Sequence, residues 1–281
     1  MNYKQTLRIF LADGNPTGLR TLELFNWSGR GVLIPRDCIE SGVKRLDVCT
    51  QGVYLLLGEN EEGEDVLYIG EGENVAERIK SHHKNKDFWD TAICFFSKDG
   101  TLNKAYVKYL EELLIGEAIE ADRIKIENGN QPRNTKLSES EEADALIFAE
   151  NIKLILSTVG YAFLKKTTDY EESNEEVYVC QGPNAKASGL YTSEGFVVLK
   201  GSIARKSFSE SSRDYLMKHQ EKLLADGVLG DHGENEFIFL KDYIFKSPSG
   251  AADLVLARSA NGWTTWLREE DGKTLDEIKR N

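Results

Sequence analysis

The chain has 281 residues, with 35 basic and 47 acidic side chains, which give a net charge of −12 at pH 7. Hydrophobic residues make up 40%, enough to fill sizeable cores, and the length suits about two average domains. No stretch approaches the roughly 20 consecutive apolar residues of a membrane helix. The composition therefore argues against a membrane protein and against a largely disordered chain.

The four cysteines form no CxxC pair, and the chain has only four histidines, which excludes a zinc-ribbon site. The N-terminal region lacks the apolar core and the small-residue cleavage site of a signal peptide. We therefore expect a cytoplasmic protein with reduced structural thiols. These thiols are Cys38, Cys49, Cys94 and Cys180.

The charge is unevenly spread along the chain. Residues 1–50 carry a net charge of +2, residues 51–160 a net charge of −10 and residues 161–281 a net charge of −4. The acidic runs 59–65 and 139–144 are typical of solvated loops or helix starts. Phosphate binding needs clustered Lys and Arg, so the total charge argues mildly against a protein that coats nucleic acid. It says little about any single groove.

The first 50 residues are expected to form a β-rich arm. Alternating or apolar runs predict strands at 5–11, 19–25 and 29–34, with turn residues between them. A short helix is predicted over 35–44, where a proline can occupy the first position. This segment shows no chemistry of its own.

Residues 51–160 are expected to form an α+β domain. Two compact apolar runs, 52–57 and 65–70, lie on either side of an acidic, Gly-containing turn and predict a β-hairpin. The other predicted elements are a strand at 91–96 and helices at 74–83, 103–120 and 141–156. Ser138 lies three residues before Glu141, the spacing of a capping box at the start of the last helix.

A second domain is expected at the C-terminal end. Residues 161–188 are polar and weakly periodic, which predicts a linker, with a short strand at 176–180 left open. Residues 189–281 are expected to form a small α+β domain with helices at 215–226 and 247–258. The whole chain is thus predicted to belong to the α+β class.

The strongest chemical signal lies in the predicted hairpin and in the elements after it. The triplets Gly52-Val53-Tyr54 and Tyr68-Ile69-Gly70 put one tyrosine on each of two paired strands. Arg78 begins a helix face, with His82 one turn later, and Glu111 lies inside the long helix. Phosphodiester hydrolysis needs charge neutralisation at the phosphate, an activated water and help for the leaving oxygen. These residue types can supply all three.

Each of these residues has a chemical reason to be considered. Glu111 is a hard oxygen ligand suited to a Mg²⁺ ion that keeps most of its waters. Arg78 can bind phosphate oxygens with two parallel hydrogen bonds. Tyr54 and Tyr68 offer hydroxyls near an attacking water, and His82 is a second candidate for proton transfer.

This ordered set resembles the GIY-YIG nuclease superfamily. The two triplets, the Arg-x-x-x-His element and the helix segment 110–115 match the family in order and spacing over residues 50–160. The resemblance implies a small antiparallel sheet flanked by helices, an α/β sandwich. It also implies that Glu111 holds one metal ion, Mg²⁺ or Mn²⁺, and that Arg78 contacts the scissile phosphate. Tyr54 or Tyr68 would then serve as the base.

Several assignments stay open. Glu112 is the rival metal ligand, although the Leu-Glu-x-x-Leu-Ile frame of the family places the ligand at Glu111. Asn130 or Asn134 is a candidate for the late asparagine of the family. Taken one at a time, the tyrosines are ordinary half-buried strand residues, and the charged residues are ordinary solvated helix positions. Only their combination favours chemistry.

The C-terminal region contains a second motif but no catalytic set. Ser247-Pro248-Ser249 is typical of a helix N-cap followed by proline at the first helical position. After that helix, Asn261-Gly262-Trp263 combines a tight-turn signal with a ring that can pack or stack. This run resembles an uncharacterised domain found behind GIY-YIG nucleases, and a module appended to restriction adenine methylases.

That second resemblance implies DNA binding by the C-terminal domain. The residues implied to contact bases or phosphates are Arg258, Asn261, Trp263, Lys200, Arg205 and Lys206. The alternative is a structural turn in which Trp263 fills a small core.

Together these features predict a cytoplasmic, metal-dependent endonuclease that hydrolyses phosphodiester bonds in DNA, in restriction or phage defence. The alternative is a nucleic-acid-binding protein whose nuclease domain has lost turnover. A third reading is a protein-interaction module that uses the two acidic runs as contact surfaces. No membrane partner is expected, and the choice between a monomer and a homo-oligomer stays open.

Overall fold

The computed structural model describes residues 4–45, 47–129, 135–165, 176–207 and 213–280. Within these ranges the chain is a mixture of helices and strands with two separate sheets. Two compact units divide it, Met1–Lys166 (unit 1) and Thr167–Asn281 (unit 2). No helix in the described ranges combines the length and the apolar character needed to cross a membrane.

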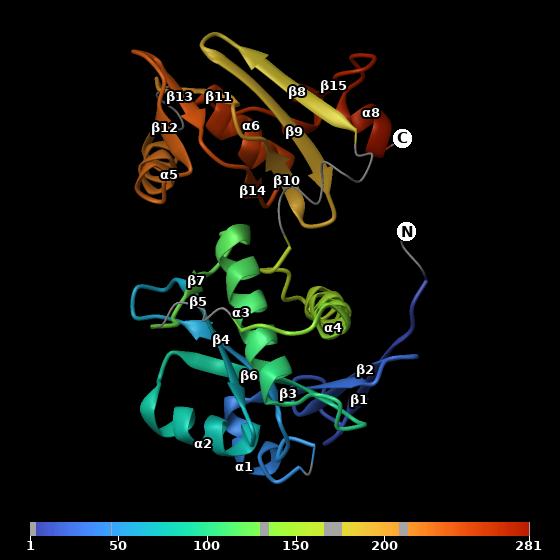
Figure 1. The fold of residues 1–281 in the computed structure, drawn as a ribbon. Coiled ribbons are helices and arrows are strands. Elements are labelled where there is room, and N and C mark those ends of the chain that lie inside the picture. Colours follow the sequence, from blue (N-terminus) through green and yellow to red (C-terminus); the bar gives the residue numbers. More distant parts are fainter. Residues whose placement is uncertain (1–3, 46, 130–134, 166–175, 208–212, 281) are drawn as a thin grey trace. The chain divides into compact units, whose positions relative to one another are not determined.

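Unit 1 is built on a seven-stranded sheet with the order β1-β2-β3-β6-β4-β5-β7 (Figure 1). The strands are β1 (Leu7–Leu11), β2 (Arg20–Leu24), β3 (Gly29–Pro35), β4 (Gly52–Glu59), β5 (Asp65–Gly72), β6 (Trp89–Ser97) and β7 (Lys125–Ile126). Neighbouring strands are antiparallel, except that β5 and β7 run parallel. The predicted hairpin at 52–57 and 65–70 is confirmed, with Tyr54 opposite Gly70.

The helical elements of unit 1 are η1 (Arg36–Cys38), α1 (Ile39–Gly42), α2 (Val75–Asn85), α3 (Lys104–Ala121) and α4 (Glu139–Thr158). Asn74, Asn103 and Ser138 cap the three long helices by accepting hydrogen bonds from backbone N–H groups. The capping box of Ser138 and Glu141 is confirmed. The single helix predicted over 35–44 is divided between η1 and α1 instead.

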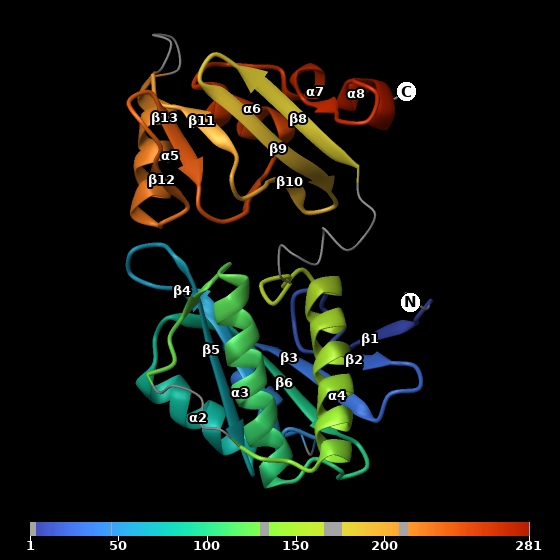
Figure 2. The ribbon, with the colours of Figure 1, turned by 45° about the horizontal axis from the view of Figure 1, so that its top comes forward.

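Side chains alternate across the sheet of unit 1, so both of its faces are buried. On β4, Val53, Leu55 and Leu57 enter one core, and Tyr54 and Leu56 enter the other. The cause is the side-chain period of two in a strand. α3 and α4 lie side by side over the first face, and α1 and α2 pack on the second (Figure 2). Unit 1 is therefore a three-layer sandwich.

The first 50 residues are not set apart as an arm. β3 pairs with β6 along its length, from Gly29 opposite Ser97 to Pro35 opposite Thr91. Leu33 enters the core under α3 and α4, and its neighbours on β3 enter the other core. β1, β2 and β3 therefore extend the same sheet that carries the predicted hairpin.

Unit 2 is built on an eight-stranded sheet whose main path has the order β12-β13-β11-β9-β10-β14, with β8 on β9 and β15 on β8. Its strands are β8 (Val177–Gly182), β9 (Ala185–Thr192), β10 (Gly195–Val198), β11 (Ile203–Arg205), β12 (Leu229–Asp231), β13 (Glu236–Phe239), β14 (Tyr243–Phe245) and β15 (Leu267–Arg268). Its helices are α5 (Arg213–Ala225), α6 (Pro248–Leu256), α7 (Gly262–Thr265) and α8 (Leu275–Lys279). Ala251, Leu254 and Val255 of α6 are completely buried and lie at the centre of the core.

Unit 2 begins before residue 189. β8 and the first part of β9 lie within 161–188 and pair with each other, with Cys180 opposite Ala187 and Gly182 opposite Ala185. The buried residues in the first half of β9 are the small Ala185, Ala187 and Gly189, which give a sequence little hydrophobic contrast. The predicted linker is therefore shorter than the sequence pattern indicates.

Candidate active site

The two motif tyrosines lie on neighbouring strands of unit 1. Tyr54 on β4 and Tyr68 on β5 both belong to the core that α2 covers. Tyr54 is completely buried, and Tyr68 is half-buried. The Tyr54 hydroxyl lies 2.8 Å from Nε2 of His82, a hydrogen-bond distance. The ring centroid of His82 lies 5.6 Å from that of Tyr54 and 5.0 Å from that of Tyr68.

Both motif glycines are explained by close approach of other atoms. A Cβ atom at Gly70 would lie 2.4 Å from the hydroxyl oxygen of Tyr54. A Cβ atom at Gly52 would lie 2.4 Å from the backbone carbonyl oxygen of Phe95 on β6. Non-bonded carbon and oxygen atoms do not approach this closely, so only glycine leaves room for the Tyr54 ring and for the pairing of β4 with β6.

α2 adds a cation and an imidazole to the two tyrosines. Buried Val75 and Ile79 anchor this helix on the sheet. Arg78 and His82 follow each other at a spacing of four residues, which puts them on one face of α2. The Arg78 side chain passes the end of β5, because a Cβ atom at Gly72 would meet its Cγ at 2.8 Å.

The charges in this group act on one another. Burial raises the pKa of the Tyr54 hydroxyl, Tyr68 adds to the rise, and the charge of Arg78 opposes it. Burial lowers the pKa of His82 to about 4, and the charges of Lys86 and Arg78 lower it further. At neutral pH the site therefore holds a neutral imidazole and a neutral phenol beside a guanidinium.

Glu111 reaches the same place from the other face of the sheet. It lies half-buried on α3, with the backbone of Glu71, near the end of β5, close to its carboxyl group. Burial raises the pKa of the Glu111 carboxyl, and the charge of Glu71 raises it further, while the charge of Arg78 lowers it. The candidate site therefore straddles the edge of β5, with the tyrosines and α2 on one side and Glu111 on the other.

The neighbouring Glu112 is held by a separate contact. Its carboxylate accepts a hydrogen bond from the backbone N–H of Thr135 at 2.8 Å and another from the Thr135 hydroxyl at 2.5 Å. Successive residues of an α-helix point about 100° apart. Glu111 therefore faces Glu71 and Arg78, whereas Glu112 faces Thr135.

The donor atoms at Glu111 fit a magnesium-like ion. Among the described residues no three His, Cys, Asp or Glu side chains are grouped so that they could hold a metal ion. Zinc sites need at least three such ligands, whereas Mg²⁺ binds through one or two carboxylates and keeps several waters. A cation at this position would also relieve the repulsion between Glu71 and Glu111 that raises the Glu111 pKa.

Asn128 is a residue of this region that the sequence analysis missed. Its side-chain oxygen accepts the backbone N–H of Ile69 at 3.0 Å, and its amide group donates to the Ile69 carbonyl at 2.6 Å. The side chain thus pairs with the edge of β5, next to Tyr68, as a further strand would. Asn130 and Asn134, the two predicted candidates, lie outside the described residues.

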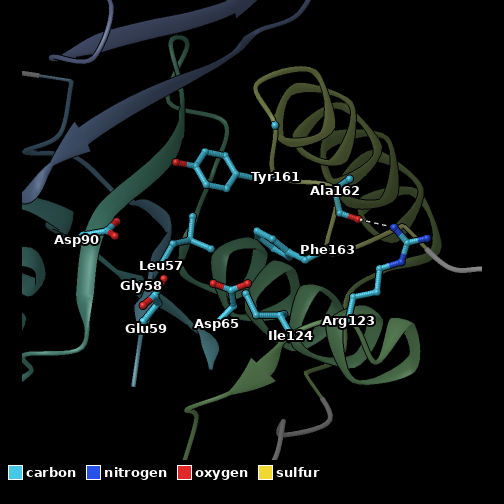
Figure 3. A pocket seen from close by; sticks show the side chains of 11 residues that line it. Leu57, Gly58, Glu59, Asp65, Asp90, Arg123, Ile124, Tyr161, Ala162 and Phe163 are labelled. Carbon is cyan, nitrogen blue, oxygen red and sulfur yellow. Dashed lines mark hydrogen bonds between the residues drawn. The ribbon is translucent and has the colours of Figure 1, made fainter. Parts of the chain in front are cut away.

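A pocket of about 450 Å³ lies elsewhere in unit 1, at the hairpin-turn end of β4 and β5 (Figure 3). Leu57, Ile124 and Phe163 form apolar parts of its lining, and Asp65 and Asp90 place carboxylates at it. None of the motif residues lines this pocket. Tyr54, Arg78, His82 and Glu111, whose pKa values are shifted by charges of the same group of residues, lie at the edge of β5 and not at this pocket, which makes that edge the candidate active site.

The cations expected to bind nucleic acid in unit 2 differ in their surroundings. The Lys206 ammonium contacts the carboxylate of Asp231. Arg205 is half-buried. Lys200 and Arg258 are exposed, and neither has a carboxylate partner in the described part of the chain. The structure therefore leaves Lys200 and Arg258 as the more accessible cations of the expected set.

The Asn261-Gly262-Trp263 sequence begins the short helix α7. The Asn261 side chain caps this helix by accepting the backbone N–H of Trp263 at 3.1 Å. A Cβ atom at Gly262 would lie 2.2 Å from the backbone of Pro248, so this glycine allows α7 to pack against the start of α6. The completely buried aromatic is Trp266, whose indole N–H donates to the Pro248 carbonyl at 3.0 Å.

Trp263 is half-buried and partly covered by its own unit. The guanidinium carbon of Arg280 lies 3.5 Å from the centroid of the Trp263 ring, and the ring of Tyr191 approaches edge-on at 5.5 Å. A base that stacked on the same face of Trp263 would have to displace Arg280. The core of unit 2 is thus filled by Trp266, and Trp263 lies at its margin.

Comparison with known protein families gives a match in the C-terminal part of the chain. Residues 178–279 match the family described as "Domain of unknown function (DUF4357)". The match runs from β8 to α8 and confirms a C-terminal domain of unknown function with an earlier start than residue 189. No curated protein and no solved structure matches the chain.

Proposed function

We propose that unit 1 hydrolyses phosphodiester bonds in DNA with the help of a divalent cation. The observation that carries this proposal is the convergence of five groups from four elements at the edge of β5. These groups are Tyr54 on β4, Tyr68 on β5, Arg78 and His82 on α2, and Glu111 on α3. The resemblance of the same residues to the GIY-YIG nucleases supports the proposal independently of the geometry.

Arg78 is proposed to bind the scissile phosphate. Its side chain is exposed, while Tyr54 and Tyr68 lie close enough to raise its pKa. A guanidinium can donate two parallel hydrogen bonds to phosphate oxygens, and it keeps its charge at every relevant pH. Contacts that strengthen as charge develops on the phosphate lower the barrier rather than only tightening binding.

The tyrosines and His82 are proposed to carry the proton of the attacking water. Tyr68 is nearer to solvent, and the buried Tyr54 hydroxyl lies next to His82 Nε2. As the Tyr68 oxygen takes the proton of the water, the Tyr68 hydroxyl proton can pass to Tyr54 and the Tyr54 proton to Nε2 of His82, so that both phenols end neutral. His82 can accept it because burial and the nearby cations keep the imidazole neutral.

Glu111 is proposed to hold Mg²⁺ or Mn²⁺, with Glu71 as a neighbouring carboxylate. When bound, such an ion supplies positive charge to the phosphate and the leaving oxygen. The attraction between the negative charge of Glu111 and the positive charge of Arg78 also keeps both side chains turned toward the edge of β5.

The proposal is tested by incubating the purified chain with supercoiled plasmid, single-stranded DNA and RNA, in Mg²⁺, in Mn²⁺ and in EDTA. We expect DNA cleavage only with a divalent ion, and none in Glu111→Gln, which keeps the shape of the side chain but removes its charge. Cleavage that persists in EDTA or in Glu111→Gln would contradict the assignment. Cleavage of RNA alone would correct the substrate class.

The alternative function is nucleic-acid binding without turnover. The net charge of −10 over residues 51–160 disfavours a large phosphate-binding surface in that domain, so under this alternative the cations of unit 2 would have to supply the contacts. Tight DNA binding by a chain that cleaves no substrate in any metal would support it. Under the main proposal, the neighbouring DUF4357 domain and the nuclease resemblance together point to a role in restriction or phage defence.

A further inference from the structure

Lys86, at the C-terminal cap of α2, is a cation held inside the candidate site. Its ammonium lies 4.7 Å from the centroid of the Tyr68 ring and 5.7 Å from that of the Phe88 ring. The side chain is half-buried, and its charge contributes to the lowered pKa of His82. Contact with two aromatic rings fixes the ammonium beside Tyr68 and restricts its motion in solvent.

No carboxylate neutralises this ammonium within the residues that the structure describes. The nearby acidic residues have other partners: Glu77 binds Lys80 at 2.8 Å, and Asp87 binds Arg36 at 3.3 Å. A half-buried charge without a counter-ion is unfavourable unless an anion binds to it. The Lys86 ammonium is therefore positioned to bind an anion next to the tyrosines.

Arg78 and His82 lie one turn apart on α2, and Lys86, the extended C-cap residue of that helix, continues this row because its ammonium lies over the Tyr68 ring, which neighbours His82. Eight residues of helix span about 12 Å. A nucleic-acid strand in a duplex carries one phosphate per roughly 3.4 Å of axis, so a row of this length faces more than one phosphate. Residues 78–86 also contain four Lys or Arg residues and no acidic residue, in contrast to the rest of 51–160.

We propose that Lys86 binds a second phosphate of the substrate strand, next to the phosphate that Arg78 contacts. The substrate of this site is then a polynucleotide rather than a small phosphodiester. The inference rests on the proposed function, which places the scissile phosphate at Arg78. An ammonium suits the outer position, because it acts as a point charge and does not require one fixed phosphate orientation.

The first test measures binding of a fluorescein-labelled DNA duplex to the full-length protein in EDTA at several salt concentrations. Lys86→Gln keeps much of the stem that packs on Tyr68 and Phe88 but removes the charge. We expect it to weaken binding on the order of tenfold and to lower the slope of log affinity against log salt by about one. Lys86→Arg is expected to restore most of the affinity.

Lys84→Gln is the matched control. It removes the same charge from the exposed end of the same helix, but two residues away and outside the row. We expect its salt slope to stay close to that of the wild type. An equal fall of the slope in Lys84→Gln and Lys86→Gln would overturn the proposal, because it would show an effect of total charge only.

The second test compares cleavage of DNA with hydrolysis of bis(p-nitrophenyl) phosphate, which has a single phosphate group. We expect Lys86→Gln to raise KM for DNA several-fold more than KM for the small diester, because only the DNA carries a second phosphate for Lys86 to bind. If Lys86 only orients the Tyr68 ring, both reactions fall together while DNA affinity stays the same, and the proposal is overturned.

The two proposals fail in different ways. If DNA binding depends on Lys86 but no substrate is cleaved, the phosphate contact of Lys86 is supported and the proposed hydrolysis is wrong. If cleavage depends on metal but the salt slope of DNA binding is the same in wild type and Lys86→Gln, the proposed hydrolysis is supported and the phosphate contact of Lys86 is wrong. A wild-type protein that binds no DNA at low salt overturns both.

Discussion

Two adjacent glutamates on α3 have different surroundings, and this difference can be measured. Glu111→Gln is expected to abolish cleavage and to leave thermal stability unchanged or slightly higher, because it removes a carboxylate that Glu71 repels. Glu112→Gln is expected to retain cleavage but to lose about 1 kcal/mol of stability, because it weakens two hydrogen bonds from Thr135. Thermal unfolding and plasmid cleavage of both variants check this pair. The reverse pattern would make Glu112 the metal ligand.

The two tyrosine hydroxyls can be separated from the rings that carry them. Tyr54→Phe keeps the buried ring but removes the partner of His82 Nε2, and Tyr68→Phe removes the hydroxyl nearer to solvent. We expect each variant to lose about 10²-fold in turnover while the fold is retained, in line with the usual contribution of general-base catalysis. Single-turnover cleavage rates measure the loss. If both variants cleave like the wild type, proton transfer does not use the tyrosines.

His82 gives the protein a dependence of stability on pH. Its pKa is about 4 in the fold, against about 6.5 in an unfolded chain. Below pH 6.5 the unfolded state therefore binds more protons, and this contribution to stability falls until the pH reaches about 4. We expect the slope to stay below about 1.4 kcal/mol per pH unit, because the side chain is only half-buried.

Chemical unfolding between pH 4 and pH 7 checks this expectation. His82→Asn is expected to be less pH-dependent than the wild type over this window. His83→Asn, which changes the exposed neighbouring histidine, serves as the control and is expected to follow the wild type. Equal pH dependence in all three proteins would show that His82 takes up its proton at its ordinary pKa.

At the scale of single elements, local sequence patterns were sufficient to predict helices and hairpins, whereas the pairing of strands distant in sequence could not be predicted. The hairpin, α3 and the capping box of α4 follow from alternation, the 3.6-residue period and a short polar motif, all of which are local. The pairing of β3 with β6 joins residues about 60 positions apart, so no window of sequence contains it. The contact of Asn128 with Ile69 is missed for the same reason.

The candidate site likewise has features that the sequence predicts and features that only the folded structure shows. A resemblance in spacing was enough to select Tyr54, His82 and Glu111. The sequence could not show that Tyr54 is buried and hydrogen-bonded to His82, or that the Glu112 carboxylate accepts hydrogen bonds from Thr135. These properties depend on which face of a strand or helix each side chain occupies after packing.

The glycines of the hairpin can be tested as parts of the element. Gly70→Ala is expected to displace the Tyr54 hydroxyl, to break its bond to His82 and to reduce cleavage at least tenfold, with a loss of about 1–3 kcal/mol from overpacking. Gly52→Ala is expected to destabilise unit 1 at least as much, because the obstacle is backbone of β6 rather than a movable side chain.

Gly116 on α3 is the control for these substitutions. A Cβ atom there meets nothing within 4 Å, so Gly116→Ala is expected to stabilise the helix by about 0.5–1 kcal/mol. Urea unfolding measures the stability of the three variants, and plasmid cleavage measures their activity. A neutral effect of Gly70→Ala on both stability and activity would contradict the role assigned to its close contact with Tyr54.

At the scale of the whole molecule, the two units have separate cores, which supports dividing the chain near residue 166. The sequence indicated two domains but placed the start of the second one too late. The reason is that the first half of β9 carries small and polar side chains, so the pairing of β8 with β9 leaves a weak hydrophobic pattern. The match of residues 178–279 to DUF4357 gives nearly the same boundary as the sheet.

Unit 2 is expected to contribute DNA affinity through Lys200 and Arg258. Both side chains are exposed and without a carboxylate partner in the described ranges, whereas Lys206 contacts Asp231. A double Lys200→Gln and Arg258→Gln variant is expected to lower the salt slope of DNA binding by about two, because two phosphate contacts are lost. Lys206→Gln is expected to leave the slope unchanged and to serve as the control. Fluorescence anisotropy with labelled duplex DNA measures all three proteins.

Removal of residues 167–281 extends this test to the whole unit. The remaining chain, residues 1–166, has its own core and keeps every residue of the candidate active site, so it is expected to fold and to cleave DNA at high enzyme concentration. Its DNA binding is expected to be weaker and less dependent on salt than that of the full chain, because fewer counterions are released. The net charge of −4 over residues 161–281 means that the two exposed cations must act locally. A folded fragment 167–281 with no affinity for DNA at low salt would assign unit 2 to protein contacts instead.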